Sequence, residues 1–285
     1  MMHWCISSSL LISAVILLRK LNGTWVSARM RYATWGVVLV RLLIPFWTQF
    51  YYNSILGSKT MSVWLVQWDR KLTENQEFYQ LLMAIYLFGV LITGTVLLIS
   101  NLRFSYGLRR QREEVSVKDI DLPTYVTAKI DSPCLVGVIR PCIYVNPLVY
   151  GDEELLNYTL LHEVCHFRRK DYVWSFLRCL CLCLHWYNPL VWVAAYLSKI
   201  DSELACDEAV VHKIGYENRF DYGRALIAVT CGAAQSLPIA ATAMIGNECI
   251  VKRRVLRIAA EPYTPVSEII WTVWMLFLIV MYTCL

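Results

Sequence analysis

Charged residues are scarce in this sequence, and regular cysteine spacing is absent. Only 17% of the 285 residues are charged and 57% are hydrophobic, whereas soluble domains carry about 25% charged residues. The 11 cysteines are scattered, often inside apolar stretches, unlike the framework of a small disulfide-bonded secreted domain. These features exclude a disordered chain and an ordinary soluble fold, and they predict reduced thiols that face cytosol or lipid.

The small excess of positive charge is concentrated beside apolar segments. The chain has 27 Lys and Arg against 22 Asp and Glu, a net charge of +5. Most of the excess falls in two short blocks that flank hydrophobic runs. This distribution is typical of membrane orientation signals, so we expect a lipid bilayer as partner and no direct contact with nucleic acid.

Four segments approach the roughly 20 apolar residues that cross a bilayer: 1–18, 33–56, 78–102 and 269–285. The first has no Lys or Arg before its apolar stretch and no small-residue cleavage site before Arg19. We therefore expect a retained span rather than a signal peptide.

Basic residues predict the topology. The loop after the first span and the segment after the third are rich in basic residues, namely Arg19, Lys20, Arg29 and Arg31, then Arg103, Arg109, Arg110 and Arg112. The positive-inside rule places both in the cytosol. The loop at 57–77 balances three basic residues with three acids, so we expect it, and the N-terminus, to be outside.

Arg41 is a charged residue within the second predicted span, four residues before Pro45. Burying it in lipid costs about 2.5–3.5 kcal/mol on insertion scales, so it should face other helices. Two interpretations stay open: an ion pair that transmits a signal between spans, or a packing or snorkelling residue.

Nearly all the acids lie between the third and fourth spans, where 103–265 is long enough for one domain. Residues 134–145, with Gly137 and Arg140-Pro141, predict a hairpin. Asp152 is the predicted N-cap of a helix over 153–170. Further helices are predicted at 172–186, 189–214 and 220–233. Residues 172–197 are also apolar enough for a fifth span, but polar residues and Asn188-Pro189 interrupt them, which favours two helices.

The helix at 153–170 carries His162-Glu163-Val164-Cys165-His166, an H-E-x-x-H motif. Residues i and i+4 project from one helical face, so both imidazoles can reach one Zn²⁺ while Glu163 lies beside its open position. Alone the motif is only suggestive; its helical context strengthens it.

A catalytic zinc also needs a third protein ligand and a position for water. Glu203 and Asp207 share one face of the predicted 189–214 helix. We expect Glu203 to bind the metal and Asp207 to accept the free N–H of a ligating histidine. Without the upstream motif, this pair would indicate only a solvated helix face.

A rival metal site is formed by Cys179, Cys181, Cys183 and His185. Spacing by two residues aligns ligands on a strand but splays them around a helix. Because the surrounding composition is helical and apolar, buried thiols are the favoured interpretation.

The chain resembles the membrane-integrated zinc metallopeptidases of the BlaR/MecR type, antibiotic-sensing signal transducers of bacteria. The resemblance covers nearly the whole chain. Besides the three leading spans and the zinc motif, it is carried by Ser132-Pro133, Gly137, Pro141, Arg169, Asp171, 185–189 (His-Trp-Tyr-Asn-Pro), Glu203, Cys206-Asp207, 219–226 and 252–258.

The resemblance implies a mostly α membrane protein with about four transmembrane helices and a cytosolic α+β gluzincin-like zinc metalloprotease domain. Its parts would be 1–102, with three spans, the protease domain at 103–265 and a fourth span at 266–285. It implies zinc ligands at His162, His166 and Glu203, with catalysis by Glu163. Sensor-bearing relatives continue into an extracellular β-lactam-binding domain, whereas this sequence ends at Leu285. Three alternatives stay open: the sensor is absent, it was removed, or another protein supplies it.

We therefore expect a multi-pass endopeptidase of the bacterial membrane. Its expected substrate is a cytosolic DNA-binding repressor, which it cleaves in response to β-lactam or cell-envelope stress. We also expect that it can cleave its own chain around 259–267. The hairpin at 134–145 either pairs with an extended substrate or serves as sheet scaffolding. Candidate transition-state stabilisers are His185, Tyr187 and His212. A non-enzymatic transducer with a structural zinc is the alternative, a transporter is a third class, and a homodimer stays open.

Overall fold

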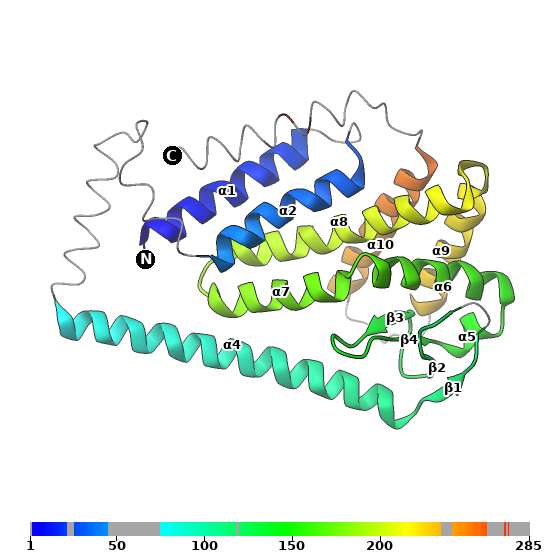
Figure 1. The fold of residues 1–285 in the computed structure, drawn as a ribbon, viewed down its shortest axis with the longest axis horizontal. Coiled ribbons are helices and arrows are strands. Elements are labelled where there is room, and N and C mark those ends of the chain that lie inside the picture. The colour runs from blue at the N-terminus through cyan, green and yellow to red at the C-terminus, as the bar shows by residue number, and fades with distance from the viewer. Residues whose placement is uncertain are drawn as a thin grey trace. The chain divides into compact units, whose positions relative to one another are not determined.

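The computed structural model describes residues 2–21, 26–44, 75–117, 120–234, 241–260, 271 and 273. It is mostly helical with one small sheet (Figure 1). The chain forms two compact units, and each is made of segments that are separated in sequence. The first unit comprises Met1–Leu97, Leu177–Lys199 and Tyr263–Leu285, and the second comprises Leu98–Phe176 and Ile200–Pro262.

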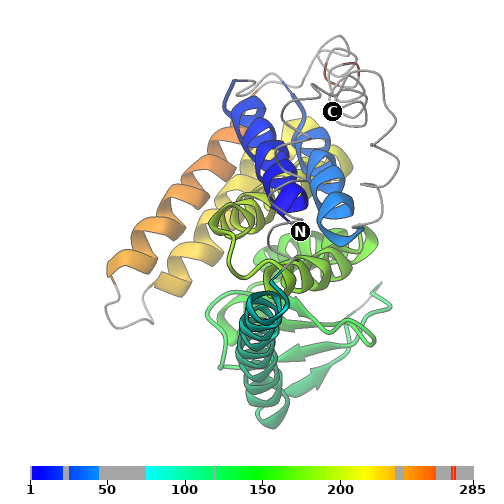
Figure 2. The ribbon, with the colours of Figure 1, turned by 90° about the vertical axis from the view of Figure 1, so that its left-hand side faces the viewer.

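The first unit contains α1 (Met2–Leu21), α2 (Ala28–Leu43), most of α4 (Gln76–Arg110), and the adjoining halves of α7 (Asp171–Leu184) and α8 (Pro189–Ile214). Helices α1 and α2 lie side by side (Figures 1 and 2). Helix α2 starts five residues before the predicted second span, because the Ser27 hydroxyl accepts a hydrogen bond from the Met30 amide at 3.3 Å and caps the helix.

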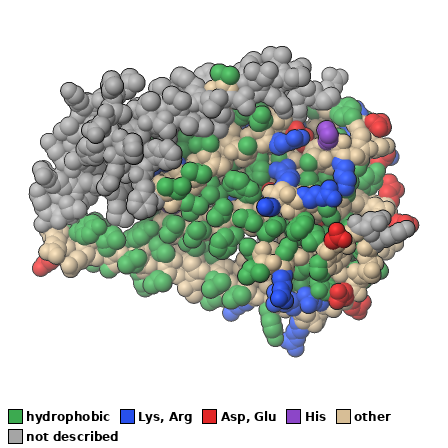
Figure 3. Space-filling view, in the orientation of Figure 1, with side chains coloured by type: hydrophobic (Ala, Val, Ile, Leu, Met, Phe, Trp, Pro, Cys, Tyr) green, Lys and Arg blue, Asp and Glu red, His purple; other side chains and the backbone are tan. Residues whose placement is uncertain are grey.

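Helix α4 is the one helix of the described residues that is long and apolar enough to cross a membrane. It contains the whole predicted third span, 78–102, and most of its apolar side chains are exposed. Hydrophobic side chains gather along it in Figure 3. All of the fourth predicted span except residues 271 and 273, and the end of the second span beyond Ile44, lie outside the described residues, so a count of four spans stays a prediction.

A short segment between α7 and α8 bonds to three other helices of the first unit. His185 Nε2 lies 3.1 Å from the Leu42 carbonyl oxygen on α2. The Trp186 indole N–H donates to the Tyr86 carbonyl on α4 at 3.2 Å, and the Asn188 amide donates to the Ser9 hydroxyl on α1 at 2.9 Å. The segment ends α7 at Leu184, so 172–197 forms two helices, as predicted.

Arg41 also lies within the first unit, on the face of α2 that packs against α1. Its side chain is 9% exposed, and its Nη2 donates to the Ser7 hydroxyl at 2.8 Å. The prediction that Arg41 faces other helices is therefore confirmed.

The second unit contains a four-stranded sheet with the order β1-β2-β4-β3. Its strands are β1 (Glu113–Val115), β2 (Thr124–Val126), β3 (Cys134–Val136) and β4 (Cys142–Val145). The β3–β4 pair is the predicted hairpin, and Gly137, with φ of 107°, takes a left-handed conformation that favours glycine. β2 pairs with β1 antiparallel and with β4 parallel.

The helices of the second unit begin with α5 (Pro147–Tyr150) and α6 (Glu153–Arg168). After α8 follow the 3₁₀ turn η3 (Tyr216–Asn218), α9 (Arg219–Ala234) and α10 (Ala241–Ala259). Asp152 caps α6 as predicted, since its carboxylate accepts hydrogen bonds from the amides of Glu154 and Leu155. Helix α8 has the predicted bounds, whereas α10 was not predicted.

Helix α6 is held between the sheet and the later helices. Leu160 packs with Ile143 and Val145 of β4 in one buried cluster. On another side of α6, Leu161 and Cys165 pack against the cluster of Val210, Tyr222, Leu226 and Ile258, and α9 and α10 run alongside each other (Figure 2). Each fully buried aliphatic side chain contributes about 1.5–3 kcal/mol, so the helix that carries the zinc motif is firmly placed.

Candidate metal centre

Two histidines of α6 bring their ring nitrogens together. His162 and His166 lie one helical turn apart, and their Nε2 atoms are 3.1 Å from each other. Glu163, between them in sequence, is buried at 6% exposure. The geometry expected for the two histidines of an H-E-x-x-H motif is therefore present.

Each histidine has a hydrogen-bond partner at its other ring nitrogen, Nδ1. His166 Nδ1 lies 2.7 Å from Asp171 Oδ2, at the start of α7. His162 Nδ1 lies 2.9 Å from the Tyr222 hydroxyl of α9, which itself donates to Asp207 Oδ1 at 2.6 Å. Because the Tyr222 proton goes to Asp207, His162 Nδ1 donates to the Tyr222 oxygen, and His166 Nδ1 donates to the Asp171 carboxylate. Both partners thereby orient the rings with their Nε2 atoms toward each other.

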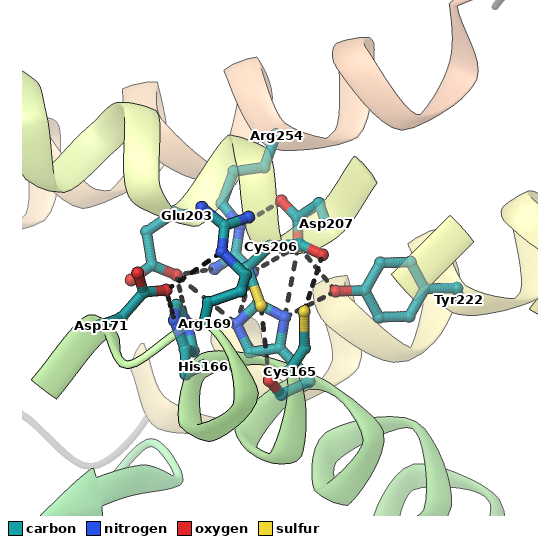
Figure 4. Close-up of polar contacts among 10 residues, drawn as sticks. Cys165, His166, Arg169, Asp171, Glu203, Cys206, Asp207, Tyr222 and Arg254 are labelled. Carbon is teal, nitrogen blue, oxygen red and sulfur yellow. Dashed lines mark hydrogen bonds and ion pairs between the residues drawn. The ribbon is translucent and has the colours of Figure 1, made fainter. Parts of the chain in front are cut away.

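Glu203 adds a carboxylate oxygen to this pair of nitrogens (Figure 4). Its Oε2 lies 3.5 Å from His162 Nε2 and 3.8 Å from His166 Nε2. Two imidazole nitrogens and one carboxylate oxygen thus face one another. Tetrahedral ligands at 2.0–2.1 Å from a zinc ion lie about 3.3 Å apart. The donor set and its spacing therefore fit a zinc ion.

Arg254 of α10 joins Glu203 to Asp207. Its Nε and Nη2 donate to the two carboxylate oxygens of Asp207 at 2.8 and 2.7 Å. Its Nη1 lies 3.3 Å from Glu203 Oε2, and its Nη2 lies 3.3 Å from His162 Nε2. The guanidinium thus compensates the buried Asp207 carboxylate and the partly buried Glu203 carboxylate, a requirement for burying such groups.

The charges around the site determine its protonation. Burial alone would raise the pKa of the Glu203 carboxyl. The neighbouring His166, His162 and Arg254 lower this pKa by more than burial raises it, so it lies well below its ordinary value. Burial and the Asp207 carboxylate raise the pKa of Tyr222 well above its usual range. Glu203 is therefore ionised and Tyr222 keeps its proton, as their hydrogen bonds require.

Two cysteines lie between the helices that carry the site. The Cys165 thiol donates to the Cys206 carbonyl at 3.8 Å, and the Cys206 thiol donates to the His162 carbonyl at 3.4 Å. Cys206, His162 and His166 form a group of three potential metal ligands whose ligand atoms lie within 4.8 Å of one another. Since the Cys206 thiol bonds to a backbone carbonyl, Glu203 is the better-placed third ligand.

The structure refines the role expected of Asp207. Asp207 Oδ1 is 3.5 Å from His162 Nδ1, so its main link to that ring passes through the Tyr222 hydroxyl, whereas Asp171 bonds directly to His166. Sequence reasoning missed Tyr222 and Arg254 because both come from distant helices. The sequence does carry a signal for Arg254. It is the single arginine on a helical face that is otherwise apolar and contains Val251, Val255 and Ile258.

Helix α6, which carries Glu163, packs against an edge strand of the sheet. Burial, and then the Glu163 carboxylate, raise the pKa of the Cys134 thiol to about 12. Cys134 begins β3, which is an edge strand of the sheet, and α6 packs against β3. Among the described residues, β3 is thus an edge strand of the sheet beside the helix that carries Glu163.

Two of the three expected transition-state stabilisers have hydrogen-bond partners elsewhere in the described structure. His185 bonds to Leu42, and the Tyr187 hydroxyl lies 2.8 Å from the Cys5 thiol, both within the first unit. His212 is exposed on α8. The rival set at Cys179, Cys181 and Cys183 lies on α7, where the spacing turns the thiols to different faces.

Comparison with known proteins agrees with the resemblance. The chain is 25% identical to "Regulatory protein BlaR1" of Bacillus licheniformis, over 88% of this chain and 49% of that protein. It is 24% identical to the "Methicillin resistance mecR1 protein" of Staphylococcus aureus and of Staphylococcus epidermidis, over 91% of this chain and 51% of each relative. The chain thus spans about half the length of these curated relatives.

A family model matches residues 1–258, which include every residue of the candidate metal centre. Its description is "BlaR1 peptidase M56", the name of a peptidase family. The converging histidines and carboxylate fit a metal-dependent peptidase. This chain belongs to the BlaR1 peptidase M56 family.

Proposed function

We propose that this protein is a zinc-dependent membrane endopeptidase with ligands His162, His166 and Glu203 and with Glu163 as general base. One observation carries the proposal: three ligand atoms, two imidazole nitrogens and a carboxylate oxygen, lie 3.1–3.8 Å apart beside the buried Glu163. Three protein ligands leave one position of a tetrahedral metal for water, as in catalytic sites.

Glu163 carries the proton transfers of the proposed reaction. A bound Zn²⁺ would lower the pKa of a water molecule and polarise the scissile carbonyl. The Glu163 carboxylate takes a proton from the attacking water and then returns it to the leaving amine nitrogen, so peptide and water give a carboxylic acid and an amine. Asp171 and Tyr222 hold the imidazoles with their Nε2 atoms toward the metal.

The edge strand β3 supports binding of an extended substrate. An added strand would pair with the outer edge of β3, which is an edge strand among the described residues and packs against the helix that carries Glu163. Main-chain pairing binds peptides with little dependence on side chains, which suits a protease without a deep specificity pocket. Scaffolding of the sheet is the competing role of the hairpin.

The test is the Glu163→Gln substitution in the full chain. We expect bound zinc to be retained and proteolysis to fall by about 10²–10⁴-fold, the usual contribution of a general base. Glu154→Gln, at an exposed position near the start of the same helix, is the matched control and should cleave like the wild type. Full proteolysis by Glu163→Gln would remove Glu163 from the mechanism.

A second candidate function is a non-enzymatic transducer with a structural zinc. The observation that favours it is Cys206, since a fourth protein ligand would close the site to water. Cys206→Ser separates the two functions. Zinc affinity and cleavage close to wild type favour the enzyme, whereas a large loss of zinc affinity favours the closed site.

We also propose that the protein is a multi-pass protein of the bacterial cell membrane, with its N-terminus outside and the metal centre in the cytosol. Helix α4 and the basic residues at its end, Arg103, Arg109 and Arg110, support this orientation. A reporter active only in the cytosol should work when inserted near Gln111 and stay silent near Ser58. The reverse pattern would place the metal centre outside.

The proposed substrate is a cytosolic transcriptional repressor, cleaved in response to β-lactam or cell-envelope stress. The support is the regulatory and methicillin-resistance names of the relatives together with the proposed cytosolic site. Self-cleavage is proposed within 259–267, of which the structure describes 259 and 260. Proteomic comparison of wild-type and Glu163→Gln cells under β-lactam treatment tests repressor cleavage and self-cleavage together. Fragments of the repressor and of this chain should appear only in cells that have Glu163.

A further inference from the structure

Arg254 contacts the metal centre through a three-point fork. Two guanidinium nitrogens bond to the two oxygens of Asp207 at 2.8 and 2.7 Å, and the third lies 3.3 Å from Glu203 Oε2. A planar guanidinium presents its donors in fixed directions. The Asp207 carboxylate therefore fixes the plane of the group and thereby the direction of the nitrogen that faces Glu203.

The oxygen of Glu203 that faces Arg254 is the one that faces the histidines. Oε2 lies 3.3 Å from Arg254 Nη1, 3.5 Å from His162 Nε2 and 3.8 Å from His166 Nε2. Glutamate has three rotatable side-chain bonds, so a ligand of this type needs a partner that selects one rotamer. Arg254 is such a partner.

Packing of α10 fixes the position of Arg254. Ile258, one helical turn further on, lies in the buried cluster with Val210 of α8 and Tyr222 of α9. The Tyr216 hydroxyl donates to the Ala260 carbonyl at 2.7 Å, just past the end of α10. The helix is therefore fixed against α8 and α9 at the turn that carries Arg254, and a shift along its axis would break these contacts.

We propose that Arg254 is a positioning residue, anchored on Asp207, that orients Glu203 Oε2 toward the two histidines and so prearranges the metal ligands. This proposal rests on the proposed metal site. The guanidinium has two opposing effects on a metal ion: its charge repels the cation, whereas its fork orients a ligand. A substitution that keeps the charge and removes the fork isolates the orienting effect.

Arg254→Lys is that substitution. Lysine keeps the positive charge, but its single ammonium lacks the planar fork that bonds to both oxygens of Asp207 and directs a third nitrogen at Glu203. We expect zinc affinity of the purified full chain, measured by competition with a chromophoric chelator, to fall by about 10- to 100-fold, as when other partners of ligands are changed. Arg253→Lys, the same change at the exposed neighbouring position, is the matched control and should bind zinc like the wild type.

A spectrum separates orientation from general destabilisation. Cobalt(II) in place of zinc has visible absorption bands that depend on ligand geometry. We expect these bands to change in Arg254→Lys and to stay the same in Arg253→Lys. If Arg254→Lys does not accumulate as folded protein, Arg254→Gln replaces it, and the spectrum alone is used because the charge changes too.

The outcomes distinguish this proposal from the function it rests on. A wild-type chain that binds neither zinc nor cobalt(II) contradicts the proposed metal site. If the wild-type chain binds both metals, and Arg254→Lys has the same zinc affinity and the same cobalt(II) spectrum as the wild type, the proposed role of Arg254 is wrong and the metal site stands. Weakened zinc binding together with an altered cobalt(II) spectrum supports it.

Discussion

The two units of this protein bury polar groups in different ways. In the second unit several buried groups are charged and paired, such as Asp207 with Arg254 and Asp171 with His166. In the first unit the described contacts between helices are mostly neutral, such as Asn188 to the Ser9 hydroxyl and Trp186 to a backbone carbonyl. The first unit also contains the candidate membrane helix α4.

This difference follows from the cost of burying charge. Ions removed from water need close partners of opposite charge, which the second unit provides around a site suited to a dication. In a bilayer the cost of an unpaired charge is higher, and polar groups there are satisfied by neighbouring helices. Arg41 is one of the charged residues buried in the first unit, and it bonds to a hydroxyl on the adjacent helix.

Removing a metal ligand should have the largest effect and should affect the second unit specifically. We expect His162→Ala or Glu203→Ala to abolish both stoichiometric zinc binding and proteolysis, because two remaining ligands hold zinc weakly. Metal analysis of the purified chain measures the first effect. Glu154→Ala, exposed on α6, is the control, and retention of one zinc per chain by either ligand variant would contradict the assigned set.

The next effect compares the two partners of the histidines. Asp171→Asn removes an ionised partner bonded directly to His166 at 2.7 Å, whereas Tyr222→Phe removes a neutral hydroxyl between His162 and Asp207. We expect the first to lower zinc affinity by about 10- to 100-fold and the second to lower it less, because Asp207 Oδ1 is already 3.5 Å from His162 Nδ1. Chelator competition measures both, and a larger loss in Tyr222→Phe would reverse this ranking.

A smaller effect tests close packing in the first unit. A Cβ at Gly89 of α4 would overlap the indole of Trp186, which is held there by its bond to the Tyr86 carbonyl, whereas a Cβ at Gly94 meets only the Cys183 sulfur at 3.9 Å. We expect Gly89→Ala to destabilise the chain by about 1–3 kcal/mol through overpacking. Gly94→Ala, the same change one and a half turns along, is the control. Thermal unfolding in detergent compares them, and equal stability would contradict this packing of Trp186.

The sequence predicted local structure better than long-range partners. The cap at Asp152, the bounds of α8 and the hairpin at Gly137 were predictable because each depends on adjacent residues. Strands β1 and β2 were missed, since three-residue strands carry too few positions for an alternating pattern and β2 pairs in parallel with a distant strand.

The candidate site shows the same limit. Spacing within one helix indicated His162 and His166, and spacing within another indicated Glu203 and Asp207. Nothing local indicates that Tyr222 lies between His162 and Asp207, or that Arg254 reaches Asp207 across 47 residues of sequence. Such contacts depend on how α9 and α10 pack, which spacing within a helix does not determine.

The smallest expected effect comes from a single neutral hydrogen bond of the first unit. The Tyr86 hydroxyl of α4 donates to the Leu184 carbonyl, at the end of α7, at 3.1 Å. Tyr86→Phe removes this bond with little change in volume, so we expect a loss of about 0.6 kcal/mol, the average for polar contacts between membrane helices. Tyr79→Phe, at an exposed tyrosine of the same helix, is the control for loss of a hydroxyl. Equilibrium unfolding in mixed detergent measures the difference. A loss comparable to that expected for Gly89→Ala would mean that helix contacts in the first unit depend on polar bonds as strongly as on packing.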